Sequence, residues 1–178
     1  AIDQFWLPMI GSFKDKKFTS ITQGQINLDD LDAKNKDKKS DSKDQKEKQD
    51  KEFVDLIAKM KVVLGERVKD IRLSSKLTDS PVCLVADDGD MDIAMEQLMA
   101  QRDTNYKGAP RILEINGDHS LIKNMKSLLS KKENNDLVSD AGTLLFEQAR
   151  LLEGKMPADP AQFSKIMNQF LLKAIPTQ

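Results

Sequence analysis

A highly charged run from Lys34 to Glu52 constrains this chain more than any other feature. The run consists of Lys, Asp, Ser, Gln, Glu and a single Asn, without a large apolar residue, a glycine or a proline. Such a segment cannot enter a hydrophobic core, so it is either a solvated helix or a disordered linker. Of the two parts that it separates, only the second is long enough to bury a core. We therefore expect the end of a preceding domain at 1–31, a charged connection at 32–52 and one domain at 53–178.

The composition excludes two classes of partner. Hydrophobic residues make up 39% of the chain and charged residues 32%, which suits a packed interior and is too charged for a membrane protein. No apolar run approaches the roughly 20 residues that span a bilayer. The formal net charge of -1 provides no long-range field that would gather nucleic acid. We expect neither a membrane nor a nucleic acid as partner.

The single cysteine and the first residues indicate where such a chain comes from. Because Cys83 is the only cysteine, an internal disulfide is excluded, and a reducing compartment is the simpler assumption. Cys83 lies in the apolar run Val82–Val85. We expect its thiol to be buried and inert. The chain begins at Ala1 without an initiator methionine or a signal pattern, which indicates a fragment of a longer polypeptide.

The hydrophobic pattern predicts an α+β fold with a small mixed sheet of about three strands and flanking helices. Apolar residues recur at helical spacing from Phe53 to Leu64, and Gly65 follows as a terminator. Strands are expected at 68–73, 82–86 and 111–115, and the first two are expected to pair. Further helices are expected from about 91 to 102 and over 121–129. The pattern of residues 1–31 predicts one helix followed by a strand at 18–22.

The last part of the chain predicts a helical hairpin. Helical spacing runs from Leu137 to Leu152 and again from Pro160 to Ala174, with Gly154 and the Asp159-Pro160 cap between the two helices. A small mixed domain cannot cover both apolar faces of such a hairpin, so apolar surface remains. Two hairpins related by a twofold axis would bury it in a four-helix bundle, on the order of 1,500 Å² in total.

The chain offers little to catalysis. It has one histidine, one cysteine and no phosphate-binding glycine motif, so we predict no catalytic residue, no metal site and no cofactor site. His119 follows Asp118 at a helix start and is expected to join a local hydrogen-bond network. The cluster Asp87-Asp88-Gly89-Asp90 lacks the spacing of a calcium loop and is read as the cap of the next helix.

A stripe of thioether and aliphatic side chains has two readings. Met91, Met95, Leu98 and Met99 fall on one helical face at spacings of three and four. Ordinary core packing explains such a stripe. An exposed surface that adapts to many partners explains it as well, because methionine is flexible and polarizable. The spacing alone does not separate the two.

Four segments resemble the C-terminal domain of the heat-shock protein 90 family of chaperones, and within it the bacterial high-temperature protein G branch. They are residues 64–73, 77–81, 114–122 and 163–171, in the order in which the family has them. The resemblance covers about residues 53–173, and residues 1–31 resemble the end of the family's middle domain. It implies a fragment of an ATP-dependent chaperone, with ATP and magnesium bound in a domain that this fragment does not contain.

The resemblance also implies the sites. It places homodimerisation in a four-helix bundle formed by the terminal hairpin, and client binding on the methionine stripe with an aromatic residue of the preceding segment. The implied dimer contacts are Leu144, Leu145, Leu151, Leu152, Phe163, Ile166, Met167, Phe170 and Leu171. The implied client contacts are Met91, Met95, Leu98 and Met99 with Phe5 or Trp6.

The resemblance extends to partners and compartment. The implied partners are a second copy of the chain and partly unfolded client proteins. The chain ends without the acidic tail that binds co-chaperone repeats, so we do not expect that interaction. The missing tail indicates a bacterial cytoplasmic protein, with an organellar member of the family as the alternative. A purely structural oligomerisation domain without client contact is the competing hypothesis, and an enzyme ranks third.

Overall fold

In a computed structural model of the chain, the described residues are 10–17, 39–87, 90, 93–102, 108–130 and 132–175. The N-terminal part contributes a small antiparallel hairpin of β1 (Ser12–Phe13) and β2 (Lys16–Lys17), which the sequence pattern did not predict. The helix and the strand expected within residues 1–31 lie outside the described residues, apart from Ile10 at a helix end.

A three-stranded mixed sheet forms the centre of the domain, as predicted. Strands β3 (Val68–Leu73), β4 (Val82–Val85) and β5 (Arg111–Ile115) follow the expected ranges closely. Their order is β3-β5-β4, with β5 parallel to β3 and antiparallel to β4. The predicted pairing of 68–73 with 82–86 is therefore wrong. All five residues of β5 are buried, as expected for the middle strand, which has a neighbouring strand on each side.

The segment between β3 and β4 passes over the end of β5 instead of forming a tight hairpin. The Asn116 side chain donates hydrogen bonds to the carbonyl oxygens of Thr78 and Ser80, at 3.1 and 3.2 Å. The amide of Ser74 donates to the carbonyl of Ile115, and the amide of Asn116 to that of Pro81. Asn116 is 3% exposed, so these bonds satisfy an amide that would otherwise be costly to bury.

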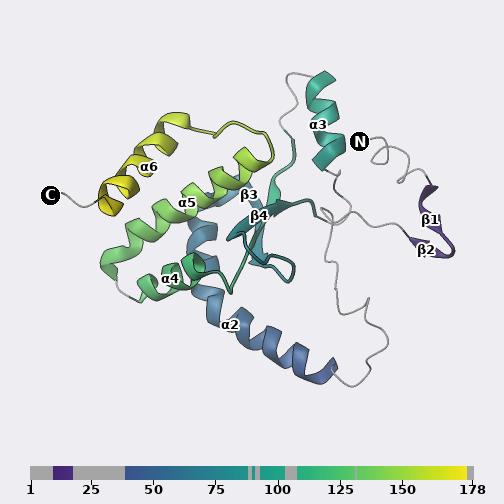
Figure 1. The fold of residues 1–178 in the computed structure, drawn as a ribbon, viewed down its shortest axis with the longest axis horizontal. Coiled ribbons are helices and arrows are strands. Elements are labelled where there is room, and N and C mark those ends of the chain that lie inside the picture. Colours follow the sequence, from purple (N-terminus) through teal and green to yellow (C-terminus); the bar gives the residue numbers. More distant parts are fainter. Residues whose placement is uncertain are drawn as a thin grey trace.

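Three helices cover one face of the sheet (Figure 1). They are α2 (Lys39–Leu64), α4 (Ser120–Leu129) and α5 (Asn135–Leu152), and short 3-10 turns at Gly65–Arg67 and Lys132–Asn134 follow α2 and precede α5. The core lies between these helices and the sheet, with Leu56, Met60, Leu113, Ile122 and Val138 among its most deeply buried side chains. Helix α2 continues unbroken from the charged run into the apolar stretch that begins at Phe53.

Helix α6 (Pro160–Ala174) packs mainly against α5, and the two form the predicted hairpin at one end of the molecule (Figure 1). Helix α3 (Ile93–Arg102) stands apart from the other helices in the same view. Within the described residues no helix is both long and apolar enough to cross a membrane. The α+β class predicted from the sequence is confirmed.

Candidate protein-interaction surfaces

The connection between α5 and α6 sets the direction in which the hairpin returns. Helix α5 ends before Gly154, which has a φ of +77°, a conformation that glycine adopts without strain. The Asp159 side chain accepts a hydrogen bond from the Gln162 amide at 2.9 Å, and Pro160 occupies the first turn of α6. The predicted cap is confirmed.

The hairpin exposes six large apolar side chains to solvent. We call this set of residues the hairpin surface. It consists of Leu151, Leu152, Met167, Leu171, Leu172 and Ile175, which are between 38% and 77% exposed. Single exposed apolar residues are ordinary on a protein surface, but several large ones on one helical hairpin are typical of an interaction site.

The structure divides the nine dimer contacts implied by the sequence into three groups. Leu151, Leu152, Met167 and Leu171 belong to the hairpin surface, while Leu144, Phe163 and Phe170 are half-buried. Leu145 and Ile166 are 3% and 4% exposed and pack inside the protomer, so they support the hairpin and offer no surface to a partner. Leu172 and Ile175 extend the surface. Their exposure was not predicted, because α6 has too many apolar residues for the pattern to separate its inner and outer sides.

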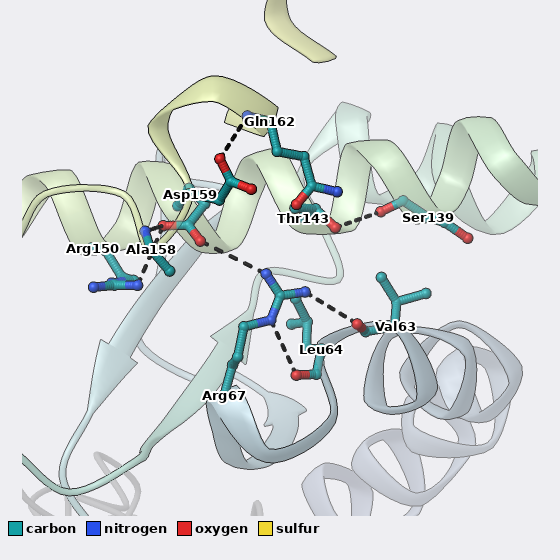
Figure 2. A network of polar contacts seen from close by, with 10 residues as sticks. Val63, Leu64, Arg67, Ser139, Thr143, Arg150, Ala158, Asp159 and Gln162 are labelled. Atoms are coloured by element: carbon teal, nitrogen blue, oxygen red, sulfur yellow. Dashed lines mark hydrogen bonds and ion pairs between the residues drawn. The ribbon is translucent and has the colours of Figure 1, made fainter. Parts of the chain in front are cut away.

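A buried carboxylate joins the hairpin to the rest of the domain, within the network of polar contacts that includes Arg67, Arg150 and Ala158 (Figure 2). Glu147 of α5 is 2% exposed, lies 3.7 Å from Arg67 and 3.5 Å from Arg150, and accepts the backbone hydrogen bond of Ala158 at 3.1 Å. Arg67 also donates to the carbonyl oxygens of Val63 and Leu64 at the end of α2. One guanidinium thus caps α2 while its carboxylate partner fixes the loop before α6.

A second buried carboxylate holds helix α3. Glu96 is 3% exposed, pairs with the guanidinium of Arg111 on β5, and accepts the backbone hydrogen bond of Ala109 at 2.7 Å. The ammonium of Lys155, in the loop between α5 and α6, lies 3.5 Å from the same carboxylate. The sequence analysis assigned no role to Glu96, since a lone glutamate gives no signal of its partners.

The orientation of Glu96 bears on the methionine stripe. Each residue turns about 100° around a helix, so Leu98 lies almost opposite Glu96, while Met99 lies about 60° from it. Leu98 is half-buried and Met99 is 41% exposed. Phe5, Trp6 and Met91 lie outside the described residues, as does the side chain of Met95. The side of α3 that faces the domain therefore carries the Glu96 carboxylate, which pairs with Arg111. The described part of the methionine stripe includes one exposed methionine, Met99.

Gly108 provides a test of how tightly α3 is held. Its φ is +70°, and a methyl group there would come within 2.7 Å of Oε1 of Glu96. Gly154 has a similar φ of +77° with open space around it. We expect Gly108→Ala to lower the free energy of unfolding by about 1–3 kcal/mol more than Gly154→Ala does, because only the first substitution displaces the buried carboxylate. Urea unfolding of both variants measures the difference, and equal losses would show that Glu96 moves aside freely.

The residues considered for catalysis or for metal binding make hydrogen bonds and ion pairs within the fold. Nδ1 of His119 accepts the Leu121 amide hydrogen bond at 3.1 Å and caps α4, as predicted. Asp87 and Asp90 each lie 2.9 Å from the ammonium of Lys69, and hydrogen bonding to these carboxylates raises the pKa of that lysine. The described part of the chain contains no group of three residues able to hold a metal ion.

Cys83 is half-buried beside Glu114, and its reactivity can be predicted. Burial, and then the Glu114 carboxylate, raises the pKa of the Cys83 thiol to about 11. The thiolate fraction at pH 8 is then about 100-fold lower than for a thiol of unperturbed pKa, and higher intrinsic nucleophilicity regains roughly 10-fold. Iodoacetamide should therefore modify the folded chain about 10-fold more slowly than the urea-unfolded chain. Equal rates would show that the thiol is not shielded.

Comparison with known proteins settles the family. The sequence model of the family described as Hsp90 protein matches residues 1–178. The chain belongs to the Hsp90 family. Among its Hsp90 relatives, the chaperone protein HtpG of Roseobacter denitrificans is 40% identical over 98% of this chain, and those of Paramagnetospirillum magneticum and a Wolbachia of Brugia malayi are 38% and 37% identical over the same share. The chain spans 27–28% of the length of these relatives.

Proposed function

We propose that this chain is the part of an Hsp90-type chaperone that holds two copies together and presents a binding surface to partly unfolded proteins. The observation that carries the proposal is the hairpin surface, a group of exposed leucine, isoleucine and methionine side chains at one end of the domain. The activity of the longer protein, with ATP and magnesium bound elsewhere and a bacterial cytoplasmic location, belongs to the same proposal. It rests on the family and on relatives named as chaperones.

A second copy of the chain is the occupant that best fits the hairpin surface. A helical hairpin that meets its own copy about a twofold axis forms a four-helix bundle, in which each helix covers the apolar side of another. The support from within the protomer suits this role, because Leu145 and Ile166 are buried inside the protomer and Glu147 accepts a hydrogen bond from the loop between α5 and α6. A preformed surface loses little conformational entropy on association.

Sedimentation equilibrium of the 178-residue chain tests this part of the proposal. We expect a dimer at tens of micromolar, since burial of roughly 1,500 Å² is the size of a standard stable interface. A mass that stays at the 20.0 kDa of one chain throughout that range would exclude dimerisation by these residues.

Helix α3 is the proposed client surface. The support is the exposed side chain of Met99, on a helix that is held to the domain through Glu96. A thioether side chain adapts to varied apolar segments without a fixed geometry. A purely structural oligomerisation domain would leave this surface without a partner.

Binding of a permanently unfolded, fluorescently labelled polypeptide separates these two functions. Met99→Glu should weaken binding by about 10-fold, the effect of losing one moderate interface contact, while the thermal midpoint stays nearly unchanged. Met156→Glu is the matched control, since Met156 is 71% exposed in the loop between α5 and α6. Unchanged binding by the Met99 variant would favour the structural role.

A further inference from the structure

A cavity of about 230 Å³ lies where five parts of the fold meet, namely the 3-10 turn after α2, β4, the start of β5, α5 and the loop before α6. Its walls carry Arg67, Arg111, Arg150 and Lys155 against a single carboxylate, that of Glu153. So many cations around a small space are unusual, because like charges that share a low-dielectric site repel each other.

The cations are held in two pairs, each by a buried carboxylate that is not part of the cavity lining. Arg67 and Arg150 lie 5.5 and 5.9 Å from the centroid of the Phe146 ring and share Glu147. The other pair, Arg111 and Lys155, shares Glu96 in the same way. Each carboxylate therefore offsets two cations with one negative charge and holds them without filling the cavity.

Among the described residues, the groups named here carry more positive than negative charge. With Glu153 included, the four cations and three carboxylates carry one net positive charge, and Arg111, Glu96, Glu147 and Glu153 are all at least nine-tenths shielded from solvent. An anion in the cavity would offset this excess at a place where water screens it poorly.

We propose that this cavity binds a phosphate group, either inorganic phosphate or the phosphate of a small monoester. Guanidinium groups match the oxygens of phosphate in a forked geometry, and several cations suit a dianion better than a single carboxylate. Leu84, Pro110 and Phe146 add an apolar wall that could contact a small organic substituent. The volume is below the roughly 300 Å³ at which pockets for drug-sized ligands begin, which argues against a nucleotide. The proposal does not depend on dimerisation or client binding.

Calorimetric titration of the 178-residue chain, at constant ionic strength set with chloride, tests the site. Inorganic phosphate and phenyl phosphate are the two probes, and tighter binding of phenyl phosphate identifies a monoester as the ligand. Arg150→Gln should weaken phosphate binding by about 10- to 100-fold, the usual effect of losing a charge-assisted hydrogen bond. Arg102→Gln is the matched control, because Arg102 is exposed on α3 and does not line the cavity.

Lys155→Gln provides a second variant, since the Lys155 side chain is 34% exposed and its loss disturbs the core less than the loss of a buried arginine. It too should weaken phosphate binding while the Arg102 variant binds as the unmodified chain does. The proposal is overturned if the unmodified chain shows no saturable heat with either probe beyond the chloride reference. Equal weakening in the Arg102 variant would overturn it as well, since it would indicate nonspecific charge attraction.

Discussion

Leu171→Glu should convert the chain from a dimer into a monomer at tens of micromolar. Leu171 is 48% exposed in the protomer and lies among the other residues of the hairpin surface on α6. A charge on the apolar side of a bundle would have to be desolvated on association, and the strongest interface contacts contribute about 2–4 kcal/mol. The dimer dissociation constant should therefore rise by about 30- to 1,000-fold, as measured by sedimentation equilibrium.

Val62→Glu is the control for this experiment. Val62 is 80% exposed on α2, so the substitution adds the same charge in place of an exposed β-branched residue away from the hairpin. It should leave the dimer intact. If both variants dissociate equally, charge alone weakens the dimer and the hairpin surface is not the contact. Circular dichroism should show the same helix content for both variants and the unmodified chain.

Glu147→Leu should cause the largest loss of stability of any single substitution considered for this chain. The substitution removes the charge that Arg67 and Arg150 share and the acceptor of the Ala158 amide. Removal of one partner from a buried ionic network costs about 3–5 kcal/mol, because the groups left behind are neither hydrated nor paired. At about 2–4 °C per kcal/mol for a chain of this size, the thermal midpoint should fall by roughly 6–20 °C.

A graded series separates the two contributions of Glu147. Glu147→Gln keeps an oxygen that can accept the Ala158 hydrogen bond but loses the charge, so its midpoint should lie between those of the leucine variant and the unmodified chain. Glu52→Gln is the surface control. The Glu52 carboxylate pairs with Lys126 at 2.7 Å at the solvent-exposed surface, and its loss should leave the midpoint nearly unchanged. A glutamine variant as unstable as the leucine variant would assign the whole effect to the charge.

The two buried carboxylates give the loop between α5 and α6 a role beyond connection. Glu147 binds its backbone at Ala158, and Glu96 pairs with its Lys155. The proposed dimer element and the proposed client helix are therefore both attached to one loop of a few residues. A displacement of either element would change the distances of these charged contacts in the loop, and such contacts tolerate little displacement.

The sequence by itself determined the local elements and the family. The strands at 68–73 and 111–115, the cap at Asp159 and the break at Gly154 follow from alternation, capping chemistry and glycine, all of which act over a few residues. The charged run marked where the core could begin, although α2 extends back to Lys39, since helical propensity does not require an apolar face.

Only the tertiary structure decided which sides of these elements meet. It placed β5 between β3 and β4, buried Leu145 and Ile166 while leaving Leu171 exposed, and turned Glu96 toward Arg111. Strand order and the partner of a buried charge depend on residues that are far apart in the chain, such as Arg67 and Glu147. Periodicity reports how apolar a side of a helix is, but the surface that covers it comes from elsewhere in the fold.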